Sequence, residues 1–196
     1  RILVAGGFQR YAEEGGVGGQ AAEKYLHGPS DQSFLFDPRT GAFEALGSIG
    51  EGRAAFAMVY VPALTSSDQG FVLVYGGASR LDIDESLPFP YVLERQHALA
   101  TYVVYDIAKK EWRPGVQDTS GKRLKRAFPR AALLADNTVV ITGGGEWPTD
   151  DSDYRNVEIW NPYKDRLEDV TNFSSDWVRS GHSLTFIKNA VDDETN

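Results

Sequence analysis

The chain has 196 residues, of which 41% are hydrophobic, and a formal net charge of −8 at pH 7. This length and apolar content allow a sizeable core, which excludes an intrinsically disordered segment. The acidic balance argues against nucleic-acid binding, as do the basic residues, which are scattered apart from one cluster at residues 122–126. The absence of cysteine removes disulfides and thiolate sites, but it is compatible with either cytoplasm or secretion. No targeting segment is recognised, and no apolar stretch approaches the roughly 20 residues of a membrane-spanning helix, so the compartment stays open.

Three apolar runs that end in paired glycines are the strongest pattern in the sequence. The runs are RILVAGG, FVLVYGG and VVITGGG, with the pairs at Gly6 and Gly7, Gly76 and Gly77, and Gly143 and Gly144. Each run predicts a buried strand that stops where the backbone needs a positive φ or a close approach. Because the pattern occurs three times, the sequence indicates a repeat protein.

The elements between the first two glycine pairs can be predicted in chain order. Residues 8–32 are polar and glycine-rich and predict a long irregular loop. Residues 33–46, SFLFDPRTGAFEAL, predict a short hairpin, because apolar side chains flank an Asp-Pro-Arg-Thr-Gly turn. Residues 53–61 predict another strand, and residues 62–70 connect it to the second glycine-pair strand. The order of elements then begins again.

The hairpin turn recurs with the same spacing. An Asp or Asn preceded by an aromatic residue is followed six positions later by a large apolar residue: Asp37 and Phe43, Asp106 and Trp112, Asn161 and Leu167. We expect this large side chain to pack on the neighbouring unit. An arginine precedes or starts the next strand at Arg53, Arg130 and Arg179, and we expect it to satisfy loop carbonyls between units. Four strands per unit follow from this order.

Together these features resemble the kelch repeat. FDPRTGAF, YDIAKKEW, WNPYKDRL and RSGHSLTFI carry the resemblance, which covers nearly the whole chain. It implies an all-β fold, a β-propeller of kelch type in which each blade is a sheet of four antiparallel strands. Phe43 and Leu167 stand where the family usually has tryptophan, and the units are longer than the roughly 50 residues of a typical kelch repeat.

The resemblance divides the chain into parts of successive blades. Residues 1–47 are the end of a first blade, 48–117 a second blade, 118–172 a third, 173–190 the first strand of a further blade, and 191–196 a polar tail. Since propellers close with about 4 to 8 blades, the chain represents an incomplete propeller. We expect the remaining blades to come from a longer chain or from a second copy of this one.

Strand order predicts which face of the propeller binds. If the strands of a unit are named a to d, the b–c and d–a connections share one face. The b–c connections are residues 8–32, 78–100 and 145–156, and the d–a connections are residues 114–129 and 169–178. Long irregular segments on a rigid scaffold commonly carry recognition. The sequence therefore predicts that this face binds a protein or a glycan.

Aromatic, arginine and acidic side chains of this face are the candidate ligand-binding residues, because they combine contact area with directional hydrogen bonds. The candidates are Trp147, Asp151, Tyr154, Arg155, Arg95, Arg126 and Tyr91. Trp147 ranks first, since it follows the third glycine pair in the shortest b–c loop, near the expected central opening. For each residue the alternative is that it fastens its own loop to the scaffold.

Two groups of residues have the chemistry of metal ligands. His27 and His97 follow their glycine pairs at the same spacing and could together hold zinc or copper, but two unrelated surface histidines are the preferred interpretation. Asp150, Asp151 and Asp153 lack the spacing of an EF-hand loop and are better interpreted as a solvated acidic loop. We therefore expect no metal and no cofactor.

His182, at the start of a strand, is expected to pack or to form hydrogen bonds.

Enzymatic functions find no positive support in the sequence. Kelch-like copper radical oxidases that resemble galactose oxidase need a cysteine cross-linked to tyrosine and two histidine ligands, and this chain has no cysteine. GGVGG lacks the Lys-Ser/Thr of a phosphate-binding loop, and no G-x-S-x-G or HExxH motif occurs. The preferred function is a binding module. The alternatives are part of a propeller enzyme whose catalytic residues lie outside this chain, and a structural subunit of a larger assembly.

Replacing Trp147 with alanine tests the binding face. We expect weaker partner binding with a nearly unchanged thermal transition, because a ligand-contacting side chain is dispensable for packing. Circular dichroism melting and a binding titration measure the two effects. Equal binding, or a large loss of stability, would show that Trp147 has a structural role.

Overall fold

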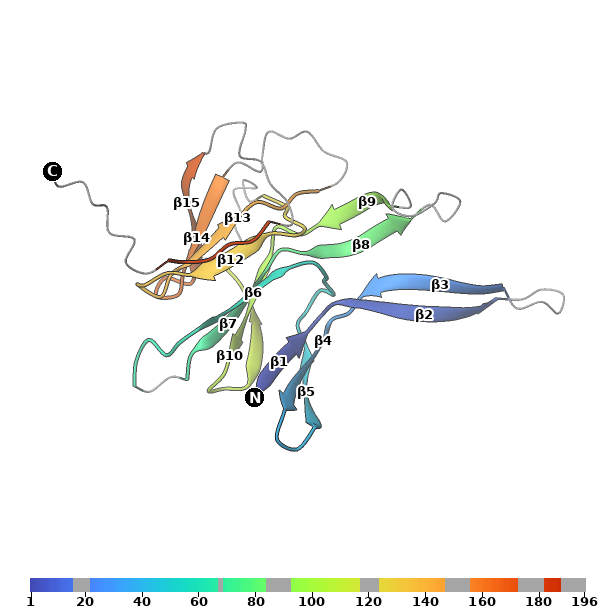
Figure 1. Ribbon diagram of the computed structural model, residues 1–196, viewed down its shortest axis with the longest axis horizontal. Coiled ribbons are helices and arrows are strands. Elements are labelled where there is room, and N and C mark those ends of the chain that lie inside the picture. Colours follow the sequence, from blue (N-terminus) through green and yellow to red (C-terminus); the bar gives the residue numbers. More distant parts are fainter. Residues whose placement is uncertain are drawn as a thin grey trace.

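The computed structural model describes residues 1–15, 22–66, 69–83, 93–116, 124–146, 156–172 and 182–187. These residues form three antiparallel sheets and two two-stranded ribbons, with no helix among them (Figure 1). The all-β class and the four-stranded antiparallel units predicted from the sequence are confirmed. Within this part of the chain, no helix has the length and apolar character to cross a membrane.

The three sheets follow one another along the chain. The first has the order β1-β4-β5, from β1 (Ile2–Ala5), β4 (Gln32–Asp37) and β5 (Ala42–Ser48). The second has the order β11-β10-β7-β6, from β6 (Ala57–Val61), β7 (Phe71–Tyr75), β10 (Tyr102–Asp106) and β11 (Glu111–Pro114). The third has the order β12-β13-β14-β15, from β12 (Arg130–Leu133), β13 (Val139–Thr142), β14 (Asn156–Asn161) and β15 (Arg166–Asn172).

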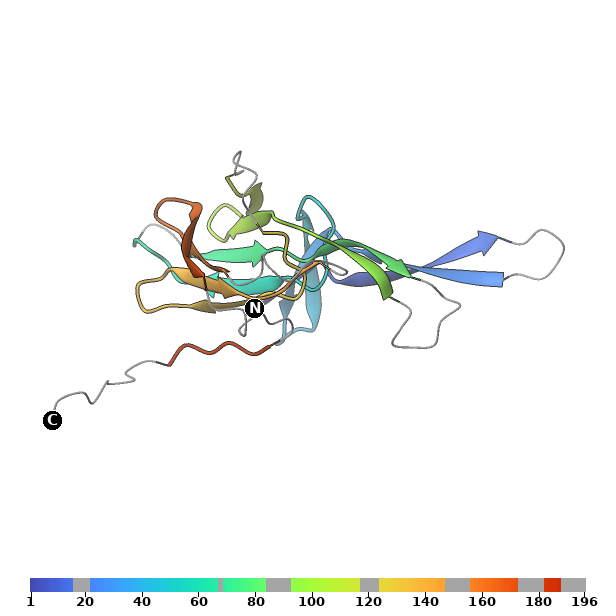
Figure 2. The same ribbon diagram turned by 90° about the horizontal axis from the view of Figure 1, so that it is seen from above.

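The second sheet lies between the other two and is covered on both faces (Figures 1 and 2). Side chains alternate between the two faces of a strand, so Leu73 and Tyr75 face the third sheet while Val74 faces the first. The layer toward the third sheet is formed by Val61, Leu73, Tyr75, Tyr102, Val104, Val139, Ile141 and Trp160. The layer toward the first is formed by Ile49, Val74 and Val103, with Ala5, Phe56 and Trp112 around them. Burial on both faces explains why β7 and β10 are almost continuously apolar.

The residues between β1 and β4, and between β7 and β10, differ from the sequence prediction. Instead of an irregular loop over residues 8–32, β2 (Phe8–Gly15) and β3 (Ala22–Pro29) pair as an antiparallel ribbon. A second ribbon, β8 (Ala78–Ile83) with β9 (Leu93–Ala98), follows the second glycine pair. The glycine-rich run that suggested a loop begins only at the last residue of β2. Cross-strand pairing satisfies the backbone groups that an exposed loop would leave to water.

The two ribbons project from the same side of the sheets. Strand β3 lies beside β8, and both ribbons extend to the right of the sheets in Figure 1. This arrangement agrees with the sequence expectation that the connections between the second and third strands of each unit share one face.

The turns between the outer two strands of each sheet repeat one local structure. The side-chain oxygen of Asp37, Asp106 or Asn161 accepts a backbone N–H two or three residues later. The fifth position of each turn then has a positive φ, at Gly41, Lys110 and Asp165. An Asp or Asn side chain stabilises such a turn because it takes the place of a backbone acceptor.

The large residue after each turn packs as predicted in two of three sheets. Trp112 joins the layer between the first and second sheets, and Leu167 packs on the layer between the second and third. Phe43 instead is 63% exposed and contacts Phe34 and Phe36 of its own sheet. The first sheet therefore carries an open apolar face.

The first two glycine pairs contact the backbone of the next unit. Gly7 N–H donates to the Arg53 carbonyl at 2.9 Å, and Gly77 N–H donates to the Arg126 carbonyl at 2.8 Å. A Cβ at Gly6 would lie 2.5 Å from the Arg53 carbonyl oxygen, and one at Gly76 would lie 2.4 Å from that of Arg126. Positive φ and close approach, the two requirements inferred from the sequence, therefore apply together.

These contacts correct the assignment of equivalent arginines. Ala54 bridges to Ala78 as Ala127 bridges to Gly145, which makes Arg126 the counterpart of Arg53. Arg130 does start β12, but it lies four positions further along the chain. The sequence pattern misassigned it because an arginine directly before an apolar run looked like the marker. The structural marker is the Arg-Ala pair that contacts the glycines.

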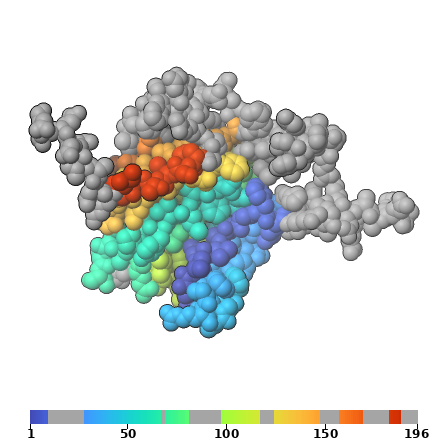
Figure 3. All heavy atoms as spheres, viewed as in Figure 1, coloured from blue at the N-terminus to red at the C-terminus, as the bar shows by residue number. Residues whose placement is uncertain are grey.

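Residues 182–187 form no strand pairing with other described residues, although the sequence predicted a strand over 173–190. They lie against the third sheet, where they are coloured red in Figure 3. The His182 ring nitrogen Nε2 is 2.7 Å from Thr142 Oγ1, and its carbonyl accepts a hydrogen bond from Arg130 Nε. The hydrogen-bonding role expected for His182 agrees with these contacts.

Replacing Gly76 with alanine tests the close approach of its Cα to the Arg126 carbonyl. At φ +67 we expect a conformational cost of about 1–2 kcal/mol, and the clash with the Arg126 carbonyl adds about 1–3 kcal/mol. Gly41→Ala is the matched control, because Gly41 has φ +73 with nothing within 4 Å of the added Cβ. Urea unfolding measures both. Equal losses of unfolding free energy would show that the carbonyl contact is unimportant.

Candidate functional site

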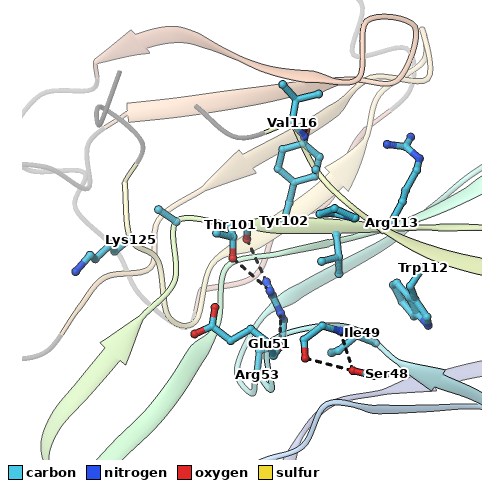
Figure 4. Close-up of a pocket in the computed structure, with 15 residues that line it drawn as sticks. Ser48, Ile49, Glu51, Arg53, Thr101, Tyr102, Trp112, Arg113, Val116 and Lys125 are labelled. Carbon is cyan, nitrogen blue, oxygen red and sulfur yellow. Dashed lines mark hydrogen bonds between the residues drawn. The ribbon is translucent and has the colours of Figure 1, made fainter. Parts of the chain in front are cut away.

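A cavity of about 770 Å³ lies between the first and second sheets (Figure 4). One wall is the connection from β5 to β6, residues 48–53, and the other is formed by β10, β11 and the residues after β11. The lining residues are Ser48, Ile49, Gly50, Glu51, Arg53, Ala100, Thr101, Tyr102, Val103, Trp112, Arg113, Pro114, Gly115, Val116 and Lys125. Its volume is in the range of about 300–1,000 Å³ that small-molecule sites occupy.

The cavity lies on the side of the sheets from which the ribbons project. The connection that forms its first wall is fastened to the base of the first ribbon, because Arg53 N–H donates to the Ser30 carbonyl at 3.1 Å. A Cβ on Gly52 would lie 2.6 Å from the Pro29 carbonyl oxygen, so the chains touch there. Ribbons and cavity therefore belong to one surface.

The apolar part of the lining comes from the packed layer between the two sheets. Ile49 and Val103 are buried in that layer. Trp112 is held in place because its indole Nε1 donates to Ser33 Oγ of the first sheet at 2.8 Å. These side chains are fixed by packing before any ligand arrives, which lowers the entropic cost of binding.

The opposite wall is fixed by Tyr102. Its hydroxyl donates to the Asp165 carbonyl at 2.8 Å and accepts the Val116 N–H at 3.0 Å. A Cβ on Gly115 would fall 2.2 Å from the Tyr102 ring, so only glycine lets the chain cross the ring there. Arg113 forms an ion pair with the same Asp165. The third sheet thus holds the residues that follow β11.

Arg53 is the charged group of the cavity floor. It is 1% exposed, and its guanidinium donates to Gly76 O and Thr101 O at 3.1 Å, to Thr101 Oγ1 at 3.2 Å and to Glu51 O at 3.3 Å. Burial lowers the pKa of Arg53 from its ordinary value, and the nearby charge of Glu51 partly offsets this. In Figure 4 the guanidinium points from the 48–53 connection toward Thr101.

The rim of the cavity carries solvated polar groups. Glu51 and Thr101 are exposed. The Lys125 side chain is 58% exposed and lies 3.7 Å from a carboxylate oxygen of Glu146. An exposed pair of this kind contributes about 0–1 kcal/mol and does not hold the ammonium tightly. Lys125 can therefore reorient toward a ligand.

Arg126, the equivalent of Arg53 in the next unit, has its charge neutralised by a buried carboxylate. Arg126 Nε lies 2.8 Å from Glu158 Oε2, with the side chains 0% and 1% exposed, and Arg126 also donates to Gly143 O at 2.6 Å. The Tyr75 hydroxyl donates to the same Glu158 oxygen at 2.7 Å. Burial raises the pKa of Tyr75 well above its ordinary value, and the Glu158 charge adds to the increase, so the hydroxyl stays protonated as a donor.

The candidates from the sequence fall in three groups. Trp147, Asp151, Tyr154, Arg155 and Tyr91 lie outside the described residues, so their ligand-binding role stays a prediction. The backbone of Arg95 lies in β9 opposite Asp82. Arg126 is described fully: its guanidinium is buried and bound to internal acceptors, which gives it a structural part in the fold.

The two histidines weighed as metal ligands occupy equivalent ribbon positions. His27 lies opposite Arg10 in the first ribbon, and His97 lies opposite Arg80 in the second. Among the residues whose side chains the structure describes, no three His, Cys, Asp or Glu gather in a way that could hold a metal ion. We assign no metal to this pair.

Sequence reasoning missed the cavity itself. The repeat pattern predicts a structural role for Arg53, and no pattern in the sequence marks Thr101, Trp112 or Val116 as site residues. The cavity forms where two connections meet the ends of β10 and β11, which no local pattern reveals. Comparing RAAF at residues 53–56 with RAFP at residues 126–129 would have identified the two equivalent arginines.

No protein-family model matches the sequence, and no curated protein matches it. Among solved structures, the chain is similar to one described as a novel fungal alcohol oxidase with catalytic diversity among the AA5 family, in complex with copper. The TM-score is 0.54 at 15% identity, and the match covers 74% of this chain and 28% of the oxidase chain. The chain thus spans about a quarter of that protein. The likeness shows a related all-β fold, and fold alone does not assign function.

Replacing Glu158 with leucine tests how much its buried ion pair with Arg126 contributes to stability. The change leaves the Arg126 charge buried without a carboxylate, so we expect a loss of roughly 3–5 kcal/mol in unfolding free energy. Glu168→Gln is the control, because Glu168 pairs with Lys164 and Arg166 at the surface and should change the unfolding free energy far less. Chemical denaturation followed by fluorescence measures both. Similar small losses would show that the buried pair contributes little.

Proposed function

We propose that the chain is part of a kelch-type β-propeller that acts as a binding module for a protein or a glycan. The proposal is supported by successive four-stranded sheets that stack face to face, and by the repeated glycine-pair and turn geometry. Stacked antiparallel sheets with short turns on one side are the arrangement that a propeller repeats around its axis.

The observation that carries the binding function is the gathering of two ribbons and a cavity on one side. Strands β3 and β8 bring the ribbons together, and residues 48–53 join the base of the first ribbon to the cavity. Extensions held by a rigid scaffold are commonly used for recognition. The opposite side offers the short turns at residues 38–41, 107–110 and 162–165.

The open apolar face of the first sheet supports the proposal that further blades complete the propeller. It exposes Ile2, Val4 and Phe43 by 52%, 44% and 63%, beside Phe34 and Phe36. The corresponding residues of the second sheet, such as Val74 and Val103, are covered by the first. A contiguous apolar face normally marks an interface. A preceding sheet, from a longer chain or a second copy, would cover it in the same way.

An oxidase is the second candidate, because the similar solved structure is an alcohol oxidase with copper. In that case the catalytic residues lie outside this chain and would be supplied by the rest of a longer protein. This candidate predicts hydrogen peroxide release from primary alcohols by the copper-loaded full-length protein, whereas the binding module predicts none.

A glycan array followed by interferometry tests the binding side. With the strongest glycan of the array as probe, we expect Arg80→Ala on the exposed surface of β8 to weaken binding about tenfold. Lys109→Ala, in a turn on the opposite side, is the control and should leave the affinity unchanged. An equal loss in both variants would contradict the assignment of the binding side, and peroxide release from primary alcohols would favour the oxidase.

A further inference from the structure

Two equivalent buried arginines have different electrostatic surroundings. Arg53 and Arg126 both donate to the carbonyl of the first glycine of a pair, at Gly76 and Gly143. Arg126 also meets the Glu158 carboxylate at 2.8 Å. Within the described part of the chain, every acceptor of Arg53 is a carbonyl or a hydroxyl. Among the described residues, no carboxylate oxygen lies within ion-pair distance of Arg53.

The register of the strands explains the difference. Glu158 lies opposite Ile141, two positions before Gly143, and Val103 lies opposite Val74, two positions before Gly76. Val103 therefore occupies in the second sheet the position that Glu158 occupies in the third. Where the third sheet supplies a carboxylate, the second has an isopropyl group that lines the cavity.

A buried cation with no carboxylate in contact is expensive. The Glu51 charge acts on Arg53, but the exposed Glu51 side chain forms no ion pair with it. Removing one partner of a buried ion pair is strongly destabilising, because the remaining charge has lost its hydration. The four neutral acceptors of Arg53 reduce this cost but do not neutralise the charge. A guanidinium has five N–H donors, so one N–H of Arg53 has no acceptor among the described residues.

We propose that the cavity binds a small carboxylate-bearing ligand whose carboxylate accepts the remaining Nη2 N–H of Arg53 and supplies the negative charge that Glu158 supplies to Arg126. The inference rests on the proposed binding function of this side and names the class of ligand. The 770 Å³ volume accommodates a body the size of a sugar acid. Trp112 and Val116 offer apolar contact to that body, while Thr101 and Lys125 at the rim offer hydrogen bonds.

A carboxylate fits this site better than a phosphate. A phosphate dianion needs several strong donors, whereas Arg53 has one N–H to give. Carboxylates combine a single charge with two acceptor oxygens, so one can meet Arg53 while the other reaches the rim.

Isothermal titration of the purified protein with D-galacturonate and D-galactose tests the inference, because these sugars differ in the carboxylate. We expect galacturonate to bind at least about tenfold more tightly, given the strength of charge-assisted hydrogen bonds. Glutarate, a dicarboxylate without a sugar ring, shows whether the carboxylate alone is recognised. Measurable glutarate binding shows that the carboxylate is sufficient. If only galacturonate binds, the sugar ring is needed as well. Equal affinity for both sugars, or equally tight binding of inorganic phosphate, would overturn the inference.

Two variants separate binding from folding. Arg53→Met should abolish galacturonate binding, but it removes hydrogen bonds of the connection and needs a folding control by circular dichroism. Val116→Trp places a large ring at a 52% exposed lining position and should block the cavity without disturbing the core. Tyr163→Trp, at a 63% exposed position in a turn of the third sheet, is the matched control and should bind normally. Unchanged galacturonate affinity in Val116→Trp would contradict the site.

The two proposals fail in different ways. If the array glycan still binds and is sensitive to Arg80→Ala, but galacturonate and glutarate give no heat, the carboxylate site is wrong and the binding side stands. If galacturonate binds and is blocked by Val116→Trp while Arg80→Ala changes no glycan affinity, the cavity stands and the ribbon surface is wrong.

Discussion

The contact between a glycine pair and the arginine carbonyl of the next unit is the constraint on which the structure depends. It joins Gly6 and Gly7 to Arg53, and Gly76 and Gly77 to Arg126. The contact leaves no room for a Cβ, so it fixes how closely one sheet can follow another. It also turns the chain from the end of one strand into a ribbon, which places both ribbons on one side.

The same contact places a buried arginine between successive sheets. The two interfaces provide different hydrogen-bond partners for its guanidinium. Between the second and third sheets, Glu158 and Tyr75 complete a closed hydrogen-bonded network around Arg126. Between the first and second, the network is open, and a cavity lies beside Arg53. Within one repeated geometry, a small difference thus separates a closed interface from one that contains a cavity.

The likeness to an alcohol oxidase concerns the scaffold. A sheet architecture of this kind carries many chemistries, since activity depends on side chains that the fold does not dictate. The described residues offer a preformed cavity, a buried cation and exposed ribbons, which are the means of recognition. These features are the basis of the proposed binding function.

The sequence by itself determined the repeated strands, the hairpin turns and the glycine pairs, because these depend on backbone conformation and on alternation between neighbours. It misjudged the insertion over residues 8–32, where glycine content masked the pairing of two strands, and it matched Arg130 rather than Arg126 to Arg53. The tertiary structure alone decided which arginine is paired and where the cavity lies. Arg126 meets Glu158, whereas Arg53 and Val103 both line the cavity. Such contacts join residues distant in the chain, so no local pattern specifies them.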